Sequence, residues 1–296
     1  MNYQDHEYMV QPARSYAQLW RTLLGFVLGF AIYAILAMMF VALFGALSGD
    51  IESLLSFADP EAQATPAGTL MMLFSFVCMT GGIVIATLAL HRRGLLSLLG
   101  PFRMMAADFL RVLGVLMLLS IVLLMLPLPS GPDETPVQNL DTGLWLKLLP
   151  IAILGVLIQT SAEEIVFRGY LQSQLAARFA SPLIWMIVPS VIFGLMHFSP
   201  EMAGDNTWFI VGWATLFGVI AADLTARAGN LGPAIAMHFL NNLIAITFIS
   251  TQGPLSGVAL YTYPFGMADA EIMAHLPQDF ATIVVGWLAA RVAISR

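Results

Sequence analysis

Long apolar stretches alternate with short polar segments along the chain. Leu23–Leu47 and Thr69–Leu90 each reach the roughly 20 apolar residues that cross a bilayer core, and Val112–Pro129 is close to that length. Shorter or interrupted apolar segments follow near residues 145–167, 182–198, 207–224, 231–250 and 280–295. The pattern predicts an all-α, polytopic membrane helix bundle with about eight transmembrane helices.

Composition supports this class. The chain is 59% hydrophobic and 10% charged, whereas soluble domains contain about 25% charged residues. The first apolar run is too long for the hydrophobic part of a signal peptide, so we expect Leu23–Leu47 to be a span. The single cysteine, Cys78, excludes an internal disulfide framework.

Basic residues indicate the orientation. If the N-terminus is cytoplasmic, Lys147 is the one exception among the 12 Lys and Arg residues, and the acidic residues fill the opposite loops. We therefore expect both termini in the cytoplasm and an integral, multi-pass protein of the bacterial cytoplasmic membrane.

The two halves of the membrane region differ in character. Residues 1–130 are expected to hold three anchoring spans without ionisable groups at their centres. The linker Pro127–Gly143, rich in Pro, Gly and acids, leads to spans four to seven within 145–250, where polar membrane residues concentrate. A last span is expected within 279–296. This organisation predicts one membrane domain with a functional half.

Glu163 and Glu164 stand side by side in the fourth span. Each charged group near the centre of a membrane helix costs about 2.5–3.5 kcal/mol, so the pair requires compensation. Glu164 and Arg168 share a helix face at i, i+4 and can form an ion pair, whereas Glu163 points about 100° away. The spacing predicts a neutralised Glu164 and an available Glu163, which suits a general base or acid. The alternative is that both carboxylates only fix packing.

Two of the five histidines lie in membrane segments. His197 follows Phe193 at i, i+4, which places the two rings together, and His238 shares a face with Asn242. Asn241 is expected to point elsewhere and to hydrogen-bond another helix. The remaining histidines, His6, His91 and His275, are expected to be solvated in tails or loops.

These side chains are compatible with three kinds of chemistry. Glu163 and His197 could polarise a water molecule while His238 and Asn242 donate hydrogen bonds to an oxyanion. Glu163, His197 and His238 could instead bind zinc, although the chain contains no HExxH helix. The third possibility is a proton or ion relay in a transporter.

The same residues resemble the CPBP intramembrane proteases, also called the type II CAAX prenyl protease and bacteriocin-processing (Abi) family. Its motifs EExxxR, FxxxH and HxxxN are matched here by EEIVFR (Glu163–Arg168), FGLMH (Phe193–His197) and HFLNN (His238–Asn242). All three occur in this order within 80 residues, and the similarity covers roughly 145–250.

The resemblance implies a membrane-embedded endopeptidase of glutamate type that needs no metal cofactor. Glu163 would be the general base, His197 its assistant, and His238 and Asn242 the oxyanion donors. Glu164, Arg168 and Phe193 would support the site structurally. The expected partners are the lipid bilayer and a membrane-associated peptide or protein substrate, CAAX-type or other, with no nucleic acid. The alternatives are a non-catalytic scaffold or immunity protein of the same family and a proton-coupled transporter.

The positions of the histidines along their spans require an irregular helix. His197 is expected near the outer end of span five and His238 near the inner end of span seven. Both can reach Glu163 only if span five is short, tilted or bent, and Pro189 permits a kink. We therefore expect a water-filled chamber near the middle of the membrane.

Overall fold

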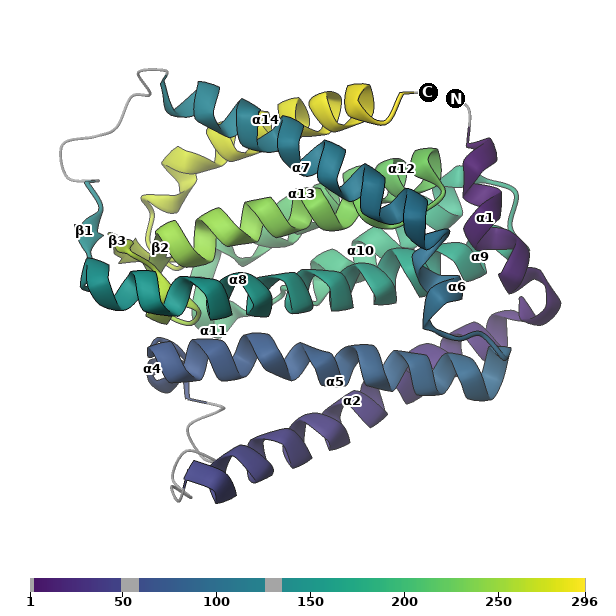
Figure 1. Ribbon diagram of the computed structural model, residues 1–296, viewed down its shortest axis with the longest axis horizontal. Helices are drawn as coiled ribbons and strands as arrows, with labels where there is room; N and C mark the ends of the chain where they lie inside the picture. Colours follow the sequence, from purple (N-terminus) through teal and green to yellow (C-terminus); the bar gives the residue numbers. More distant parts are fainter. Residues whose placement is uncertain (1–2, 49–58, 126–134, 296) are drawn as a thin grey trace.

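The computed structural model describes residues 3–48, 59–125 and 135–295 (Figure 1). A helix is present at each of the eight predicted segments. These helices are α2 (Leu19–Ser48), α5 (Pro66–His91), α7 (Phe102–Leu124), α8 (Thr142–Glu164), α10 (Val188–Leu195), α12 (Thr207–Ala228), α13 (Gly232–Leu243) and α14 (Ile272–Ala293). Five helical stretches of the described chain are long and apolar enough to cross a membrane. The all-α, multi-pass class is thus confirmed, whereas eight spans and cytoplasmic termini remain predictions.

Shorter elements connect or extend these helices. The short α-helices are α1 (Glu7–Val10), α4 (Pro60–Gln63), α6 (Leu95–Leu99), α9 (Ser173–Arg178) and α11 (Pro200–Ala203). The 3₁₀ turns are η1 (Gln4–His6), η2 (Gln11–Tyr16), η5 (Gly204–Asn206) and η7 (Ser256–Val258). The π-helical segments are η3 (Ile165–Gln172), η4 (Leu183–Ile187) and η6 (Ile244–Phe248). Residues 127–134 of the predicted linker lie outside the described chain.

Local sequence explains where the long helices begin. The Thr65 hydroxyl caps α5 by accepting a hydrogen bond from the Gly68 backbone N–H at 3.1 Å, and Pro66 occupies the first turn. The Asp141 carboxylate caps α8 in the same way through Leu144 N–H at 3.1 Å. The Asp141 cap fixes the start of α8, the helix that ends at Glu163 and Glu164.

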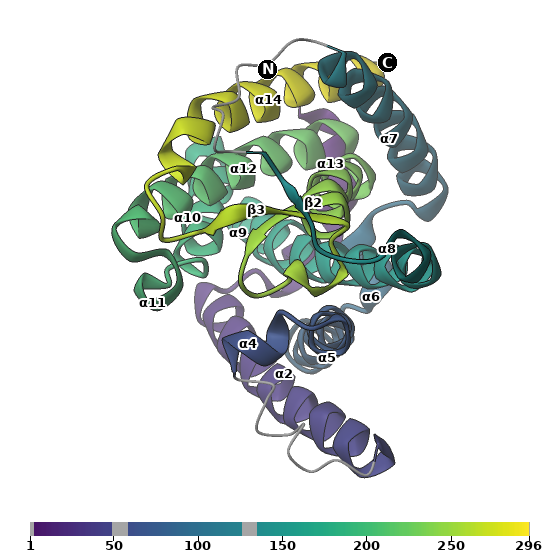
Figure 2. The same cartoon turned by 90° about the vertical axis from the view of Figure 1, so that its left-hand side faces the viewer.

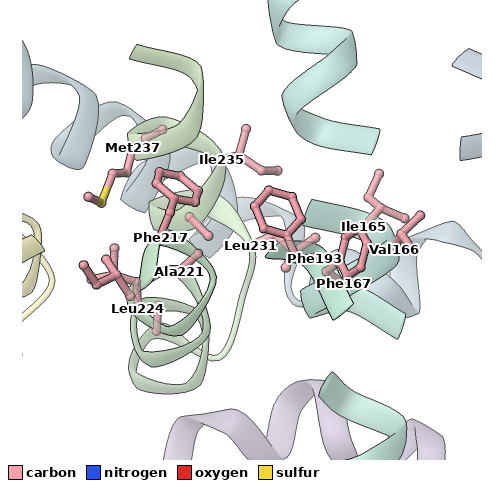
Figure 3. Close-up of a cluster of buried hydrophobic side chains, with 14 of the residues drawn as sticks. Ile165, Val166, Phe167, Phe193, Phe217, Ala221, Leu224, Leu231, Ile235 and Met237 are labelled. Atoms are coloured by element: carbon pink, nitrogen blue, oxygen red, sulfur yellow. The ribbon is translucent and has the colours of Figure 1, made fainter. Parts of the chain in front are cut away.

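The helices form a bundle around α8, α12 and α13 (Figure 2). Helix α5 packs on α8, and α2 packs on α5 at the edge of the bundle. Aromatic rings fill the core beside the candidate site. Figure 3 shows Phe193 between Phe167 and Phe217, with ring centroids 5.0 Å and 6.3 Å away. This packing holds η3, α10 and α12 together.

A small three-stranded sheet closes one end of the bundle, a feature that the apolar pattern did not predict. Strand β3 (Tyr261–Gly266) lies between β1 (Val137–Gln138), which is antiparallel, and β2 (Ile249–Gln252), which is parallel. The Trp145 indole N–H donates to the Thr247 carbonyl at 2.7 Å, which ties the start of α8 to the segment before β2.

The N-terminal segment, residues 3–16, folds onto the bundle. His6 is 4% exposed and its ring lies 4.8 Å from that of Trp185. The buried Arg93 guanidinium donates to the Met9 carbonyl at 3.3 Å, and burial lowers the pKa of Arg93 to about 10. Gly229 ends α12 with φ +66°, and a Cβ there would collide with the Asp5 carbonyl.

The expected solvent exposure of the three tail and loop histidines was wrong, and the third predicted span begins earlier than expected. His6 and His91 are buried rather than solvated, and His91 hydrogen-bonds the Tyr170 hydroxyl at 2.9 Å because α5 ends inside the protein. His275, on α14, is half-buried, with its ring 5.3 Å from that of Tyr263. Helix α7 starts ten residues before the predicted Val112, so it includes the buried Asp108, which accepts from the Asn230 amide at 2.8 Å.

Close packing of α2 on α5 predicts a position-specific effect of adding one methyl group. A Cβ at Gly82 would lie 2.8 Å from the Tyr33 backbone nitrogen and closer still to the Gly29 carbonyl. Gly82→Ala should therefore destabilise the protein by about 1–3 kcal/mol. The matched control is Gly81→Ala, whose Cβ would meet only Leu36 Cδ1 at 3.5 Å. Equal thermal midpoints for the two variants would contradict this packing.

Burial of His6 predicts pH-dependent docking of the N-terminal segment. Desolvation lowers the pKa of His6 from 6.5 to about 4, against an opposing contribution from Glu7. The docked segment therefore binds fewer protons than the detached one, so docking is strongest above pH 6.5. Protonation should weaken docking by up to about 3 kcal/mol as the pH falls toward 4.

Hydrogen exchange of residues 4–16 between pH 7 and pH 4 measures this effect. Wild type should lose protection as the pH falls, whereas His6→Phe, which keeps a ring against Trp185, should not show the same loss. An identical pH response in both proteins would show that His6 is not the responsible group.

Candidate active site

The two glutamates lie where α8 changes into the π-helical segment η3. Glu163 is 9% exposed and Glu164 is completely buried. Arg168 Nη1 donates to Glu164 Oε1 at 3.1 Å, so the predicted i, i+4 ion pair is confirmed. π-helical turns are rare and occur frequently at functional sites. The junction of α8 and η3 is therefore a candidate functional position.

Arg168 is held from its other side by aromatic rings. Its guanidinium lies 4.7 Å from the centroid of the Phe193 ring and 5.9 Å from that of Phe167. Cation–π contacts of this kind stabilise a charge that has lost its water. The predicted contact between the Phe193 and His197 rings is also present, at 4.8 Å. Phe193 therefore joins the buried ion pair to the histidine motif.

Glu163 has a different environment from Glu164. Its Oε1 accepts a hydrogen bond from Gln159 Nε2 at 2.7 Å. Its Oε2 is buried without a hydrogen-bond partner, and the nearest ionisable contact is His238 Nε2 at 3.5 Å. The prediction that Arg168 engages Glu164 and leaves Glu163 available agrees with this geometry.

His238 contacts both carboxylates, an arrangement that the sequence did not predict. Its Nδ1 lies 2.8 Å from Glu164 Oε1. Because the Arg168-paired carboxylate can only accept, Nδ1 carries the hydrogen of this bond. The opposite ring nitrogen, Nε2, faces Glu163 and carries a hydrogen only when the ring is an imidazolium.

His197 lies in an exposed turn after α10. Its Nδ1 donates to the Phe193 carbonyl at 2.9 Å, which leaves Nε2 of the neutral ring as an acceptor. His197 and Glu163 line the same cavity, but no hydrogen bond joins them among the described contacts. Any assistance from His197 to Glu163 would therefore pass through a water molecule.

The two asparagines of α13 lie on the same side of the site. The Asn242 amide N–H donates to Gln159 Oε1 at 3.0 Å, and its Oδ1 accepts from Asn241 Nδ2 at 3.1 Å. Asn241 was expected to point away to another helix, and this expectation was wrong. The half-buried ends of the two side chains turn toward each other and both line the cavity.

Five of the seven predicted site residues line one cavity of about 50 Å³, and Glu164 and Arg168 lie outside its lining. It is lined by Gln159, Glu163, Phe193, His197, Trp213, Phe217, His238, Asn241 and Asn242. This volume accommodates a few water molecules next to several polar partners, and the position of such a chamber near the middle of the membrane stays a prediction.

Helix α10 explains how the motifs meet. The apolar helix Leu183–Leu195, made of η4 and α10, is shorter than a full membrane span, as predicted, and Pro189 lies at the junction of its two parts. Because α10 ends early, the turn with His197 reaches the level of Glu163.

The alternative zinc set does not fit the geometry. Among the described residues, no group of three or more His, Cys, Asp or Glu side chains could hold a metal ion. Independence from a cofactor stays a prediction.

Sequence reasoning missed three lining residues. Gln159 precedes Glu163 by four positions, so the helical spacing could have shown that it shares the face of the base. Trp213 and Phe217 have the same spacing in α12, with stacked rings 5.8 Å apart. Aromatic residues at this spacing are equally typical of a hydrophobic core, so the sequence could not single them out.

Comparison with known proteins identifies the part of the chain that carries the site. Residues 145–244 match the family model described as Type II CAAX prenyl endopeptidase Rce1-like. The resemblance to this family is confirmed for that segment. The matched segment includes most of α8 and all of η3, α10, α12 and α13, and therefore every motif residue. It ends close to the predicted limits of 145–250.

A curated relative extends the similarity. The uncharacterized protein YyaK of Bacillus subtilis (strain 168) is 30% identical over 141 residues, which is 47% of this chain and 47% of the relative. The chain thus spans about half the length of this relative. No solved structure matches the chain. The predicted division into anchoring spans, core and last span stays a prediction.

The buried ion pair predicts that substitution of Arg168 lowers the stability of the protein much more than substitution of Arg14. Arg168→Met leaves the Glu164 carboxylate buried without its guanidinium, which should cost about 3–5 kcal/mol of stability. The control Arg14→Met removes the exposed partner of Glu7, 2.7 Å away, and should change stability little. Thermal unfolding in detergent micelles tests both. An equal loss in the two variants would contradict the role assigned to the buried pair.

Proposed function

We propose that this protein is an intramembrane endopeptidase in which Glu163 activates a water molecule to hydrolyse a peptide bond. The observation that carries the proposal is the state of the Glu163 carboxylate. One oxygen is held by Gln159, whereas Oε2 is buried and has no hydrogen-bond partner, and Glu163 is one of the residues that line the cavity. A fixed carboxylate with one unused oxygen beside room for water suits a general base.

Charge balance limits the protonation of the site. Arg168 neutralises the charge of Glu164. The pair formed by Glu163 and His238 then carries no net charge when one proton is shared between Glu163 Oε2 and His238 Nε2. We propose an ionised Glu163 facing a His238 imidazolium in the resting state. The imidazolium then supplies the N–H at Nε2 that an oxyanion donor requires.

The reaction follows from these groups. A water proton passes to Glu163 Oε2 while the water oxygen bonds to the carbonyl carbon, and the carbonyl oxygen becomes an oxyanion. His238 Nε2–H and the second N–H of Asn242 donate hydrogen bonds to that oxyanion. As the C–N bond breaks, Glu163 returns its proton to the leaving amine. His197 Nε2 would accept the second hydrogen of the water and so orient it.

We propose a membrane-associated peptide as the substrate, with C-terminal CAAX-type peptides as the first class to test. Two facts support this choice: the family model that matches residues 145–244 is named for CAAX prenyl endopeptidases, and the long apolar helices place the cavity in a membrane protein. The membrane setting does not by itself require a prenyl group, so non-prenylated peptides belong in the same assay.

The test is peptide cleavage by the purified protein in lipid nanodiscs, read by mass spectrometry. The library contains farnesylated and unmodified C-terminal peptides. Glu163→Gln should lower the rate by about 10²–10⁴-fold because the amide cannot take the water proton. Glu201→Gln, which alters an exposed glutamate outside the cavity, should cleave at the wild-type rate.

Each other outcome rejects part of the proposal. Full activity in Glu163→Gln would exclude Glu163 as the base. Activity abolished by a chelator and restored by zinc would replace water activation by glutamate with metal catalysis. Capture of a protein partner without cleavage would favour a scaffold, and pH-driven solute uptake into vesicles without a cut peptide would favour a transporter.

A further inference from the structure

Gln159 connects the two polar sides of the cavity. It lies one helical turn before Glu163 on α8 and is 8% exposed. Its Nε2 donates to Glu163 Oε1 at 2.7 Å, and its Oε1 accepts from Asn242 Nδ2 at 3.0 Å. A single side chain thus contacts both the proposed base on α8 and the proposed oxyanion donor on α13.

We infer that Gln159 is a positioning residue that sets the orientation of Glu163 and Asn242 for the reaction. The inference rests on the proposed function, because it assigns Gln159 to the same hydrolytic site. Gln159 itself neither takes a proton nor bonds to the substrate carbon. It acts through the two residues that do the chemistry.

The direction of each hydrogen bond explains why an amide is required. The donor of Gln159 fixes Glu163 Oε1, which leaves Oε2 without a hydrogen bond, 3.5 Å from His238 Nε2. Its acceptor engages one N–H of Asn242, while Asn241 donates to Asn242 Oδ1 at 3.1 Å. The Asn242 amide is therefore fixed at both ends, and its second N–H is left to donate into the cavity.

Other side chains of similar size cannot reproduce this arrangement. Methionine has nearly the length of glutamine but neither donates nor accepts a strong hydrogen bond. An ionised glutamate would keep an acceptor for Asn242, but it would place a second negative charge against Glu163. Both replacements leave the volume of this buried position nearly unchanged, so they test the hydrogen bonds rather than the packing.

Loss of the hydrogen bonds from Gln159 should lower the turnover number, kcat. Misplacement of a reacting group by about 1 Å can cost about 100-fold in rate. We therefore expect Gln159→Met to lower kcat by about 10–100-fold with KM little changed, because the lost interaction acts at the reacting atoms. A residue that only supported the fold would instead lower the fraction of active protein and the thermal midpoint.

The matched control is the same substitution at Gln174. This glutamine lies on α9, in the same continuous helix, is completely buried, and its amide has no hydrogen-bond partner in the described structure. Gln174→Met should therefore leave kcat unchanged. Gln159→Glu provides the second site variant and should lose turnover as Gln159→Met does.

The experiment uses the full chain in nanodiscs and the peptide from the library that wild type cleaves fastest. Wild type, Gln159→Met, Gln159→Glu and Gln174→Met are compared for kcat, KM and thermal midpoint. A further pair, Asn242→Leu with and without Gln159→Met, tests whether the two residues act together. If the two residues act together, Gln159→Met should lower kcat by a much smaller factor in the Asn242→Leu background than in wild type.

The outcomes separate this inference from the proposed function. Cleavage by wild type with unchanged kcat in Gln159→Met would overturn the inference alone. An equal loss of kcat in Gln159→Met and Gln174→Met would overturn it too, because the effect would be structural. Absence of cleavage by wild type for every peptide would overturn the proposed function and this inference with it.

Discussion

Glu164 and Arg168 form an ion pair, 3.1 Å long, that is almost completely removed from solvent. Neither charge would be stable in this buried position without the other, so the neighbouring side chains must be compatible with both charges. The guanidinium fixes the Phe193 ring above it, and the carboxylate fixes the ring of His238 through Nδ1. Three helices that are distant in sequence are thereby joined at one charged centre, and Glu163 at its edge is bound by Gln159 instead.

Much of this could be predicted from the sequence because helical spacing is local. The i, i+4 relation paired Glu164 with Arg168, separated Glu163 from both, and placed Phe193 beside His197. What spacing cannot supply is the contact between helices. The bridge of His238 to both carboxylates depends on how α13 packs on α8. The inward turn of Asn241 depends on a neighbouring amide, and the burial of His91 depends on where α5 ends.

The irregular segments next to the motifs have a common effect. A π-helical turn follows Glu164, and another precedes α10, the short helix that presents His197. If the helix before His197 were regular and long enough to cross a membrane, His197 would lie beyond Glu163 along the helix direction. Instead, polar side chains from α8, α10 and α13 converge on a small volume, and Phe217 and Trp213 of α12 form its apolar wall. The site is thus polar on one side and aromatic on the other.

The folded position of the N-terminal segment has a consequence for biosynthesis. The Tyr3 hydroxyl donates to Asp223 at 2.8 Å, across 220 positions of sequence, and His6 packs on Trp185. Residues 3–16 therefore dock onto partners that are synthesised long after them. At about 5–20 residues per second, α12 follows after about 10–40 s. Until then Tyr3 and His6 lack these partners, so a chaperone or the bilayer surface would compete with docking of the segment.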